Sequence, residues 1–211
     1  MIIVYKFVDL IKYNKVEIIA RQLSDFETFF VKFNSEVQNS IICCGKENIK
    51  LYKIKSGHLP GQSVILNNTA RGKIFNKAVV QFTEPKKPSY LFVTTTDGLL
   101  YFVNYSTRQV DKIIQIHDEP IVALIPSANN EFYLTASSNG ILRLWSTDFE
   151  SLKSEVNTGN QITHCDINID CNQIAVLSAP MGTISILDLD TSSFNVVLRS
   201  HMDNVTDIAH N

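Results

Sequence analysis

Residues 139–145 read Asn139-Gly140-Ile141-Leu142-Arg143-Leu144-Trp145, a two-residue turn followed at once by a short, mostly apolar run. A turn and run of the same kind stand 42 residues earlier, at Asp97-Gly98 and 99–103, and 42 residues later, at Met181-Gly182 and 183–187. Asn-Gly and Asp-Gly pairs favour tight connections between two strands. A fixed period of this length is typical of chains built from repeated structural units. We therefore interpret the chain as a repeat protein made of short strands.

The unit around this stretch resembles a WD40 repeat. Ile116-His117, Ser137, Asn139-Gly140 and Leu144-Trp145-Ser146 follow the order of that repeat, which runs from a Gly-His pair to a Trp-Asp pair. Ile116 replaces the Gly and Ser146 replaces the Asp, so the regular spacing is stronger evidence than either pair. The resemblance implies an all-β fold, a β-propeller segment of four-stranded WD40 blades.

The period divides the chain into six units. Four are long enough for a complete blade, and the first and last hold only parts of a split blade. We expect the segment to belong to a larger propeller, completed by further WD repeats or by a partner, because its ends would otherwise expose unpaired strand edges. The expected units are 1–25, 26–72, 73–116, 117–158, 159–200 and 201–211.

Composition excludes several classes of protein. With 45% hydrophobic and 19% charged residues, the chain has the balance of a globular protein, and no apolar run approaches the ~18 residues of a membrane span. There is no secretory leader after Met1, and the four cysteines form no C-x-x-C pair, so we expect a reduced, cytoplasmic compartment. No glycine-rich phosphate loop and no zinc-ligand spacing is present, which predicts no cofactor and no metal.

In well-formed WD40 blades, a loop His, a Ser or Thr, a turn Asp and the Trp indole form a hydrogen-bonded chain. By resemblance this structural network maps onto His117, Ser137, Asn139 and Trp145, with Trp145 as a buried core anchor. Asn139 in place of the acid predicts a weaker chain, because an amide oxygen carries no full charge. A Ser beside a His could also indicate a hydrolase, but Ser137 lies on an expected strand without a nucleophile elbow. We therefore expect no enzymatic activity.

Charge is divided unevenly along the chain. Residues 1–110 hold 15 Lys and Arg against 8 Asp and Glu, whereas residues 111–211 hold 4 against 13. The stretch 67–88 departs most from the period and is read as a lengthened loop around one strand, and loops on a rigid scaffold often carry binding residues. Aromatic residues are not interleaved with its bases, which argues against nucleic acid. The predicted protein-binding residues are Arg71, Lys73, Lys77, Lys86 and Lys87.

A second resemblance concerns function. Residues 178–209, in particular Gly182-Thr183-Ile184-Ser185-Ile186-Leu187-Asp188-Leu189, are similar to the propeller repeats of large centriolar and ciliary WD-repeat proteins that associate with microtubule walls. This similarity implies a structural scaffold of a cilium axoneme or centriole, with tubulin or other axonemal and centriolar proteins as partners. The alternative is an adaptor propeller that captures a substrate or cargo in another cytoplasmic complex, in ubiquitin transfer or trafficking.

Overall fold

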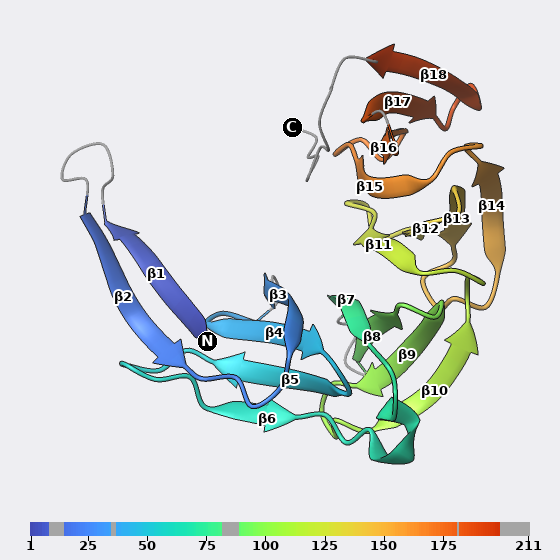
Figure 1. Ribbon diagram of the computed structural model, residues 1–211. Helices are drawn as coiled ribbons and strands as arrows, with labels where there is room; N and C mark the ends of the chain where they lie inside the picture. Colours follow the sequence, from blue (N-terminus) through green and yellow to red (C-terminus); the bar gives the residue numbers. More distant parts are fainter. Residues whose placement is uncertain (9–14, 35–36, 82–88, 181, 199–211) are drawn as a thin grey trace. The chain divides into compact units, whose positions relative to one another are not determined.

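The computed structural model describes residues 1–8, 15–34, 37–81, 89–180 and 182–198, and almost all of its regular structure is β-strand (Figure 1). Strands β1 (Ile2–Val8) and β2 (Lys15–Gln22) form a two-stranded antiparallel sheet. A short 3-10 helix, η1, spans Asn67–Ala70. The expected all-β fold is confirmed.

Four further sheets each contain four strands that follow one another in the chain. The first two are β3 (Thr28–Phe33), β4 (Ser40–Gly45), β5 (Asn48–Lys53) and β6 (Gly61–Ser63), then β7 (Phe75–Gln81), β8 (Tyr90–Thr95), β9 (Leu99–Asn104) and β10 (Val110–Gln115). The other two are β11 (Ile121–Pro126), β12 (Tyr133–Ser137), β13 (Ile141–Trp145) and β14 (Leu152–Asn157), then β15 (Ile162–Ile167), β16 (Gln173–Ser178), β17 (Thr183–Asp188) and β18 (Ser193–Leu198). Four four-stranded blades and a two-stranded part of another are therefore present, as the period predicts.

The last expected unit, 201–211, and the turn residue Met181 lie outside the described residues. The division into six units at the predicted boundaries stays a prediction.

The second strand of each four-stranded sheet is the most buried. Every residue of β4 and β12 is buried, and β8 and β16 are buried at all but their first residue. The fourth strand is the most exposed, as in β6 and β14. The first strands β7 and β11 also pair on one edge only but have no exposed residue, so pairing on one edge does not by itself account for the exposure of β6 and β14.

The chain divides into two compact units, 1–93 with 100–114, and 94–99 with 115–211. In the first unit, the core joins the two-stranded sheet to sheet β3–β6 through Ile2, Val4, Ala20, Ile41, Cys43, Tyr52 and Leu59. In the second unit, the core joins sheets β11–β14 and β15–β18 through Ala123, Leu134, Ala136, Leu142, Ile162, Cys165, Ile174, Val176 and Leu187.

The glycines of the repeated turns have a packing role. Gly98 follows β8 with φ +80°, and its carbonyl accepts hydrogen bonds from the backbone N–H groups of Ile116 and His117 at 3.0 and 3.2 Å. A Cβ at Gly98 would lie 1.8 Å from the His117 carbonyl oxygen. Gly140, with φ +97°, likewise accepts from the backbone N–H of Thr158. The turn must therefore be glycine both for its left-handed backbone and for the close approach of the following loop.

Replacing Gly98 with Ala is expected to destabilise the fold more than replacing Gly57, whose φ of +79° is almost the same but which has no atom within 4 Å of its would-be Cβ. Gly57→Ala carries only the backbone penalty of about 1–2 kcal/mol. Gly98→Ala adds a clash with backbone, worth about 1–3 kcal/mol more. Urea unfolding of the two variants, compared with the unmodified protein, measures the difference, and equal losses would remove the argument for close packing at this turn.

Candidate functional site

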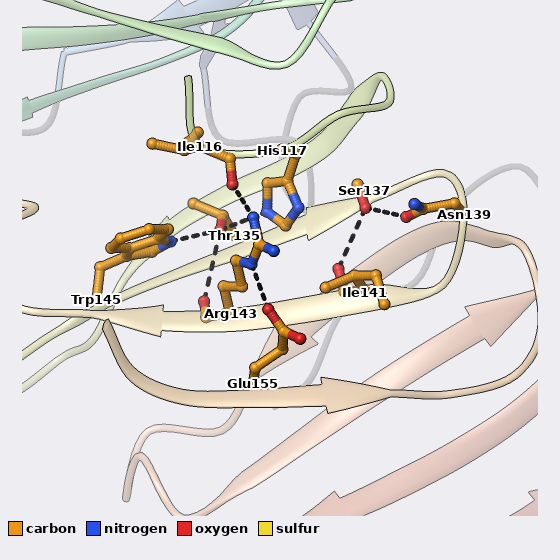
Figure 2. A network of polar contacts seen from close by, with 9 residues as sticks. All are labelled: Ile116, His117, Thr135, Ser137, Asn139, Ile141, Arg143, Trp145 and Glu155. Atoms are coloured by element: carbon orange, nitrogen blue, oxygen red, sulfur yellow. Dashed lines mark hydrogen bonds and ion pairs between the residues drawn. The ribbon is translucent and has the colours of Figure 1, made fainter. Parts of the chain in front are cut away.

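The hydroxyl of Thr135 is the centre of a polar network inside sheet β11–β14 (Figure 2). The indole Nε1 of Trp145 donates to Thr135 Oγ1 at 3.0 Å, and His117 Nε2 shares a hydrogen bond with the same oxygen at 2.8 Å. Thr135 and His117 are 0% and 2% exposed. The hydroxyl therefore satisfies two ring nitrogens that burial would otherwise deprive of water.

Strand register brings these groups together. Thr135 of β12 is paired with Arg143 of β13, and Tyr133 is paired with Trp145. Side chains two residues apart on a strand share a face, so Arg143 and Trp145 both lie on the face that carries Thr135. His117 comes from the segment that precedes β11 and that docks on the Gly98 turn.

Arg143 extends the network to two further segments. Its Nη1 donates to the carbonyl oxygen of Ile116 at 2.5 Å, and its Nε lies 2.7 Å from Glu155 Oε2 on β14. Arg143 and Glu155 are cross-strand partners in the register. One guanidinium therefore fixes the backbone just before His117 and pairs with the outer strand (Figure 2).

His117 is held in the neutral state. Burial lowers the pKa of its imidazole from 6.5 to about 4, with a further contribution from the nearby positive charge of Arg143. Desolvation penalises the charged form of a histidine, and a like charge adds to the penalty. At pH 7 the ring is therefore a neutral hydrogen-bonding group.

The network differs from the four-residue chain expected from the sequence. Ser137 Oγ donates to Asn139 Oδ1, so these two residues form a separate contact at the β12–β13 turn. The hydroxyl that meets His117 and Trp145 belongs to Thr135, which the sequence analysis did not select. Residues 135 and 137 share a strand face about 6.6 Å apart, and only the register decides which one reaches the rings.

Trp145, expected to be a buried core anchor, is half-buried. Its ring lies 6.2 Å from the ring of Phe149, which in turn stacks on Tyr133 at 4.9 Å. The short chain segment after β13 therefore covers one side of the indole. The polar N–H of the indole donates to Thr135.

The neighbouring repeats fill the same positions with other chemistry. The residues 42 positions before Thr135, Arg143 and Trp145 are Val93, Tyr101 and Val103, all buried. Tyr101 meets Phe75 edge to face at 5.0 Å, and its hydroxyl donates to the carbonyl oxygen of Thr69 at 2.7 Å. Tyr101 thus bonds to a backbone carbonyl, as Arg143 does, but this carbonyl belongs to η1 and the tyrosine ring also makes an aromatic contact.

The repeat that follows sheet β11–β14 is apolar at two of these three positions. The residues 42 positions after Thr135 and Trp145 are Leu177 and Leu187, both buried. The residue 42 positions after Arg143 is Ser185, which is also buried, so the three repeats fill these positions with different mixtures of polar and apolar side chains.

The predicted basic stretch contains the expected strand, which is β7. Arg71 and Lys73 precede β7, Lys77 lies within it, and Lys86 and Lys87 lie outside the described residues. A strand of seven residues spans about 20 Å. Arg71 and Lys73 lie before the first residue of β7, so they are about this distance from its last residue. Lys77 Nζ lies 5.8 Å from the ring centre of Phe30. Arg71 is exposed, whereas Lys73 and Lys77 are half-buried.

Within the described residues, no group of His, Cys, Asp and Glu side chains could hold a metal ion. The four cysteines are free and buried, and burial raises the pKa of the Cys43 thiol to about 12. Such thiols are inert, because the thiolate is the reactive form. No helix in the described part of the chain has the length and hydropathy needed to cross a bilayer.

The fold defined by these sheets is that of the WD40 β-propeller. The Dos1 propeller matches 88% of this chain and 52% of its own with a TM-score of 0.70 at 12% identity. The propeller domain of Cps50 (Swd1) from Myceliophteria thermophila matches 81% of this chain and 58% of its own, with a TM-score of 0.67 at 13% identity. The WD40 propeller domain of Doa1 gives a TM-score of 0.62 at 16% identity over 82% of this chain and 56% of its own.

No protein-family profile matches the chain. Among curated proteins it is similar to Centriole proteome protein 16 of Chlamydomonas reinhardtii, at 26% identity over 204 residues, which is 89% of this chain and 10% of that protein. It is also similar to WD repeat-containing protein 90 of Xenopus tropicalis, at 24% identity, covering 97% of this chain and 12% of that protein. The chain thus spans about a tenth of the length of these curated relatives.

Removing the indole of Trp145 is expected to destabilise the sheet before it affects any partner. Trp145→Ala should cost about 2–4 kcal/mol, below the usual figure for a fully buried Trp because this ring is half-buried. Trp145→Phe retains a ring but removes the N–H, and should cost about 1 kcal/mol. Urea unfolding measures both, and an unchanged midpoint for Trp145→Ala would place the ring outside the packed structure.

The depressed pKa of His117 makes stability depend on pH in a defined window. Its folded pKa of about 4 lies below the ordinary 6.5, so the unfolded chain takes up a proton first as pH falls. Stability should be unaffected by this group above pH 6.5 and should decline by about 3 kcal/mol on acidification to pH 4. His117→Gln keeps a hydrogen-bonding side chain that does not titrate, and should show a flatter profile in the same window. Parallel profiles for the two proteins would contradict the assignment.

Proposed function

We propose that this chain is part of a non-enzymatic WD40 scaffold in a microtubule-based assembly, the centriole or the cilium axoneme. The observation that supports this best is the similarity to Centriole proteome protein 16 along 89% of the chain. A second relative, WD repeat-containing protein 90, is similar along 97% of the chain. Both relatives are far longer than this segment, which suits a scaffold with many repeats.

The polar network supports a structural role for the most distinctive residues. Hydrogen bonds join His117 to Thr135, and Arg143 to the carbonyl before His117. The imidazole of His117 is neutral and almost fully buried. A catalytic base needs access to a substrate and a pKa near the working pH. These groups meet neither condition. We therefore expect binding to partners through the surface of the blades.

Electrostatics supports an acidic partner for the first half of the chain. The excess of 15 bases over 8 acids in residues 1–110 creates a positive surface potential, and clustered charge speeds association with a partner of opposite sign. Tubulin is the partner that we propose first, with other axonemal and centriolar proteins next. Arg71 is exposed at the start of β7, close in sequence to Lys73.

Charge reversal in the full-length protein tests this proposal. Arg71→Glu with Lys73→Glu, and separately Lys86→Glu with Lys87→Glu, should reduce co-sedimentation with microtubules, because each change reverses two charges on a basic segment. Exposed pairs are worth only ~0.2–1 kcal/mol each, so binding should also weaken as salt rises.

The matched control is Lys112→Glu with Lys153→Glu, which reverses two exposed bases in the acidic half of the chain. Its microtubule binding and its localisation should be retained. If all three double variants bind equally well and remain at the centriole or axoneme, the microtubule proposal fails. The adaptor interpretation would then be pursued by identifying the proteins that co-purify with the full-length protein.

A further inference from the structure

We propose that a cleft beside β5 and β6 binds an acidic peptide segment of a partner protein. The cleft has a volume of about 400 Å³ and lies in the first compact unit, between the β5–β6 connection and the turn that joins β9 to β10. Its basic lining residues are Lys53, Lys55 and Arg108. It is separate from the polar network of sheet β11–β14 and from Arg71 and Lys73, so the inference goes beyond the proposed function.

The cleft presents charge of one sign. Lys53 and Lys55 are exposed, Arg108 is half-buried, and none of the described residues that line the cleft is acidic. Cations gathered around a concavity raise the local positive potential more than the same charges on a convex surface. The cleft therefore favours an anionic occupant.

The Arg108 side of the cleft is preorganised. Asn104 Oδ1 accepts the backbone N–H groups of Ser106 and Thr107, and the Arg108 carbonyl accepts from the N–H of Ile65 at 2.7 Å. Arg108 has a φ of +58°, a left-handed backbone that is uncommon for a side chain of its size. Phe149 and Ser192, in the corresponding turns of two later sheets, have the same left-handed backbone, so this conformation belongs to the repeated hairpin and fixes where the Arg108 side chain begins.

The guanidinium of Arg108 is also held in place. Its Nη1 donates to Gln62 Oε1 on β6 at 2.7 Å, which joins the two walls of the cleft. On the opposite side, the N–H of Lys53 donates to the Pro60 carbonyl at 3.0 Å, and the N–H of Lys55 donates to the His58 carbonyl at 3.1 Å. The backbone that carries both lysines is therefore ordered by hydrogen bonds while their side chains remain exposed.

The lining suits a peptide better than a nucleic acid. Leu51, Pro60 and Tyr105 provide apolar surface between the cations, which fits an apolar side chain flanked by carboxylates. Nucleic-acid sites need a charged track with a series of stacking rings, whereas the described lining of this cleft has two tyrosines, of which Tyr52 is almost fully buried. The volume lies within the range of ~300–1,000 Å³ that is usual for specific ligand pockets. The structure therefore favours a short acidic segment with one apolar residue.

Fluorescence polarisation with a labelled peptide, rich in glutamate and carrying one leucine, tests the site in the full-length protein. The peptide should bind, a peptide with glutamine in place of every glutamate should not, and binding should weaken as salt rises. Lys53→Gln with Lys55→Gln should lower the affinity roughly three- to thirtyfold, as expected for two exposed ion pairs.

Arg21→Gln with Lys46→Gln is the matched control, because it removes two exposed bases of the same unit that do not line the cleft. Its affinity for the peptide should change less than about twofold, since only long-range charge is altered. Failure of the glutamate peptide to bind, or an equal loss in the control, would overturn the proposal. So would a single-stranded oligonucleotide that binds more tightly than the peptide and loses affinity in the Lys53 and Lys55 variant.

Because no microtubules are present, the result is independent of the microtubule proposal. Arg71→Glu with Lys73→Glu should leave peptide binding in place, even if it abolishes co-sedimentation with microtubules.

Discussion

The approach of a loop backbone to a turn glycine is the contact on which the repeated structure depends. At Gly98 the turn carbonyl accepts two backbone N–H groups, and the His117 carbonyl oxygen lies where a Cβ would be. Gly140 lies 42 residues after Gly98, and its carbonyl makes the corresponding contact with the N–H of Thr158. A side chain at either glycine would push the loop away and leave backbone groups without partners, which is costly in a buried place. The 42-residue period of the sequence is thus the distance along the chain between successive turn glycines that make this backbone contact.

Once the loop is docked, the residues behind it can vary. At sheet β11–β14 the space is filled by His117, Thr135 and Trp145, with Arg143 holding the loop carbonyl. One repeat earlier, the Tyr101 hydroxyl donates to a carbonyl of η1, and its ring packs against Phe75. A polar network needs every member satisfied, whereas apolar side chains need only to fill the volume. This difference explains why the framework is regular while its characteristic dipeptides are degenerate.

The groups available for binding lie on the surface of the protein and not in its interior. The buried groups are neutral or inert: His117 has a low pKa, and Cys43 has a high one, both mainly because of burial. Basic residues instead collect on exposed segments of the first unit, at the start of β7 and around the cleft of Lys53, Lys55 and Arg108. The acidic partners that we propose would bind at these basic residues.

The sequence by itself determined the strands, the turns and the repeated unit, because these depend on local patterns. Alternating apolar runs and left-handed glycines are readable at fixed spacing, and they gave the four-stranded sheets. Only the tertiary structure decided which hydroxyl meets His117, since Thr135 and Ser137 share a strand face and differ only in register. The same holds for the basic residues of the cleft, because the fold brings together Lys53 and Arg108, which are 55 positions apart. Local propensity sets which residues form strands, but long-range pairing sets which side chains become neighbours.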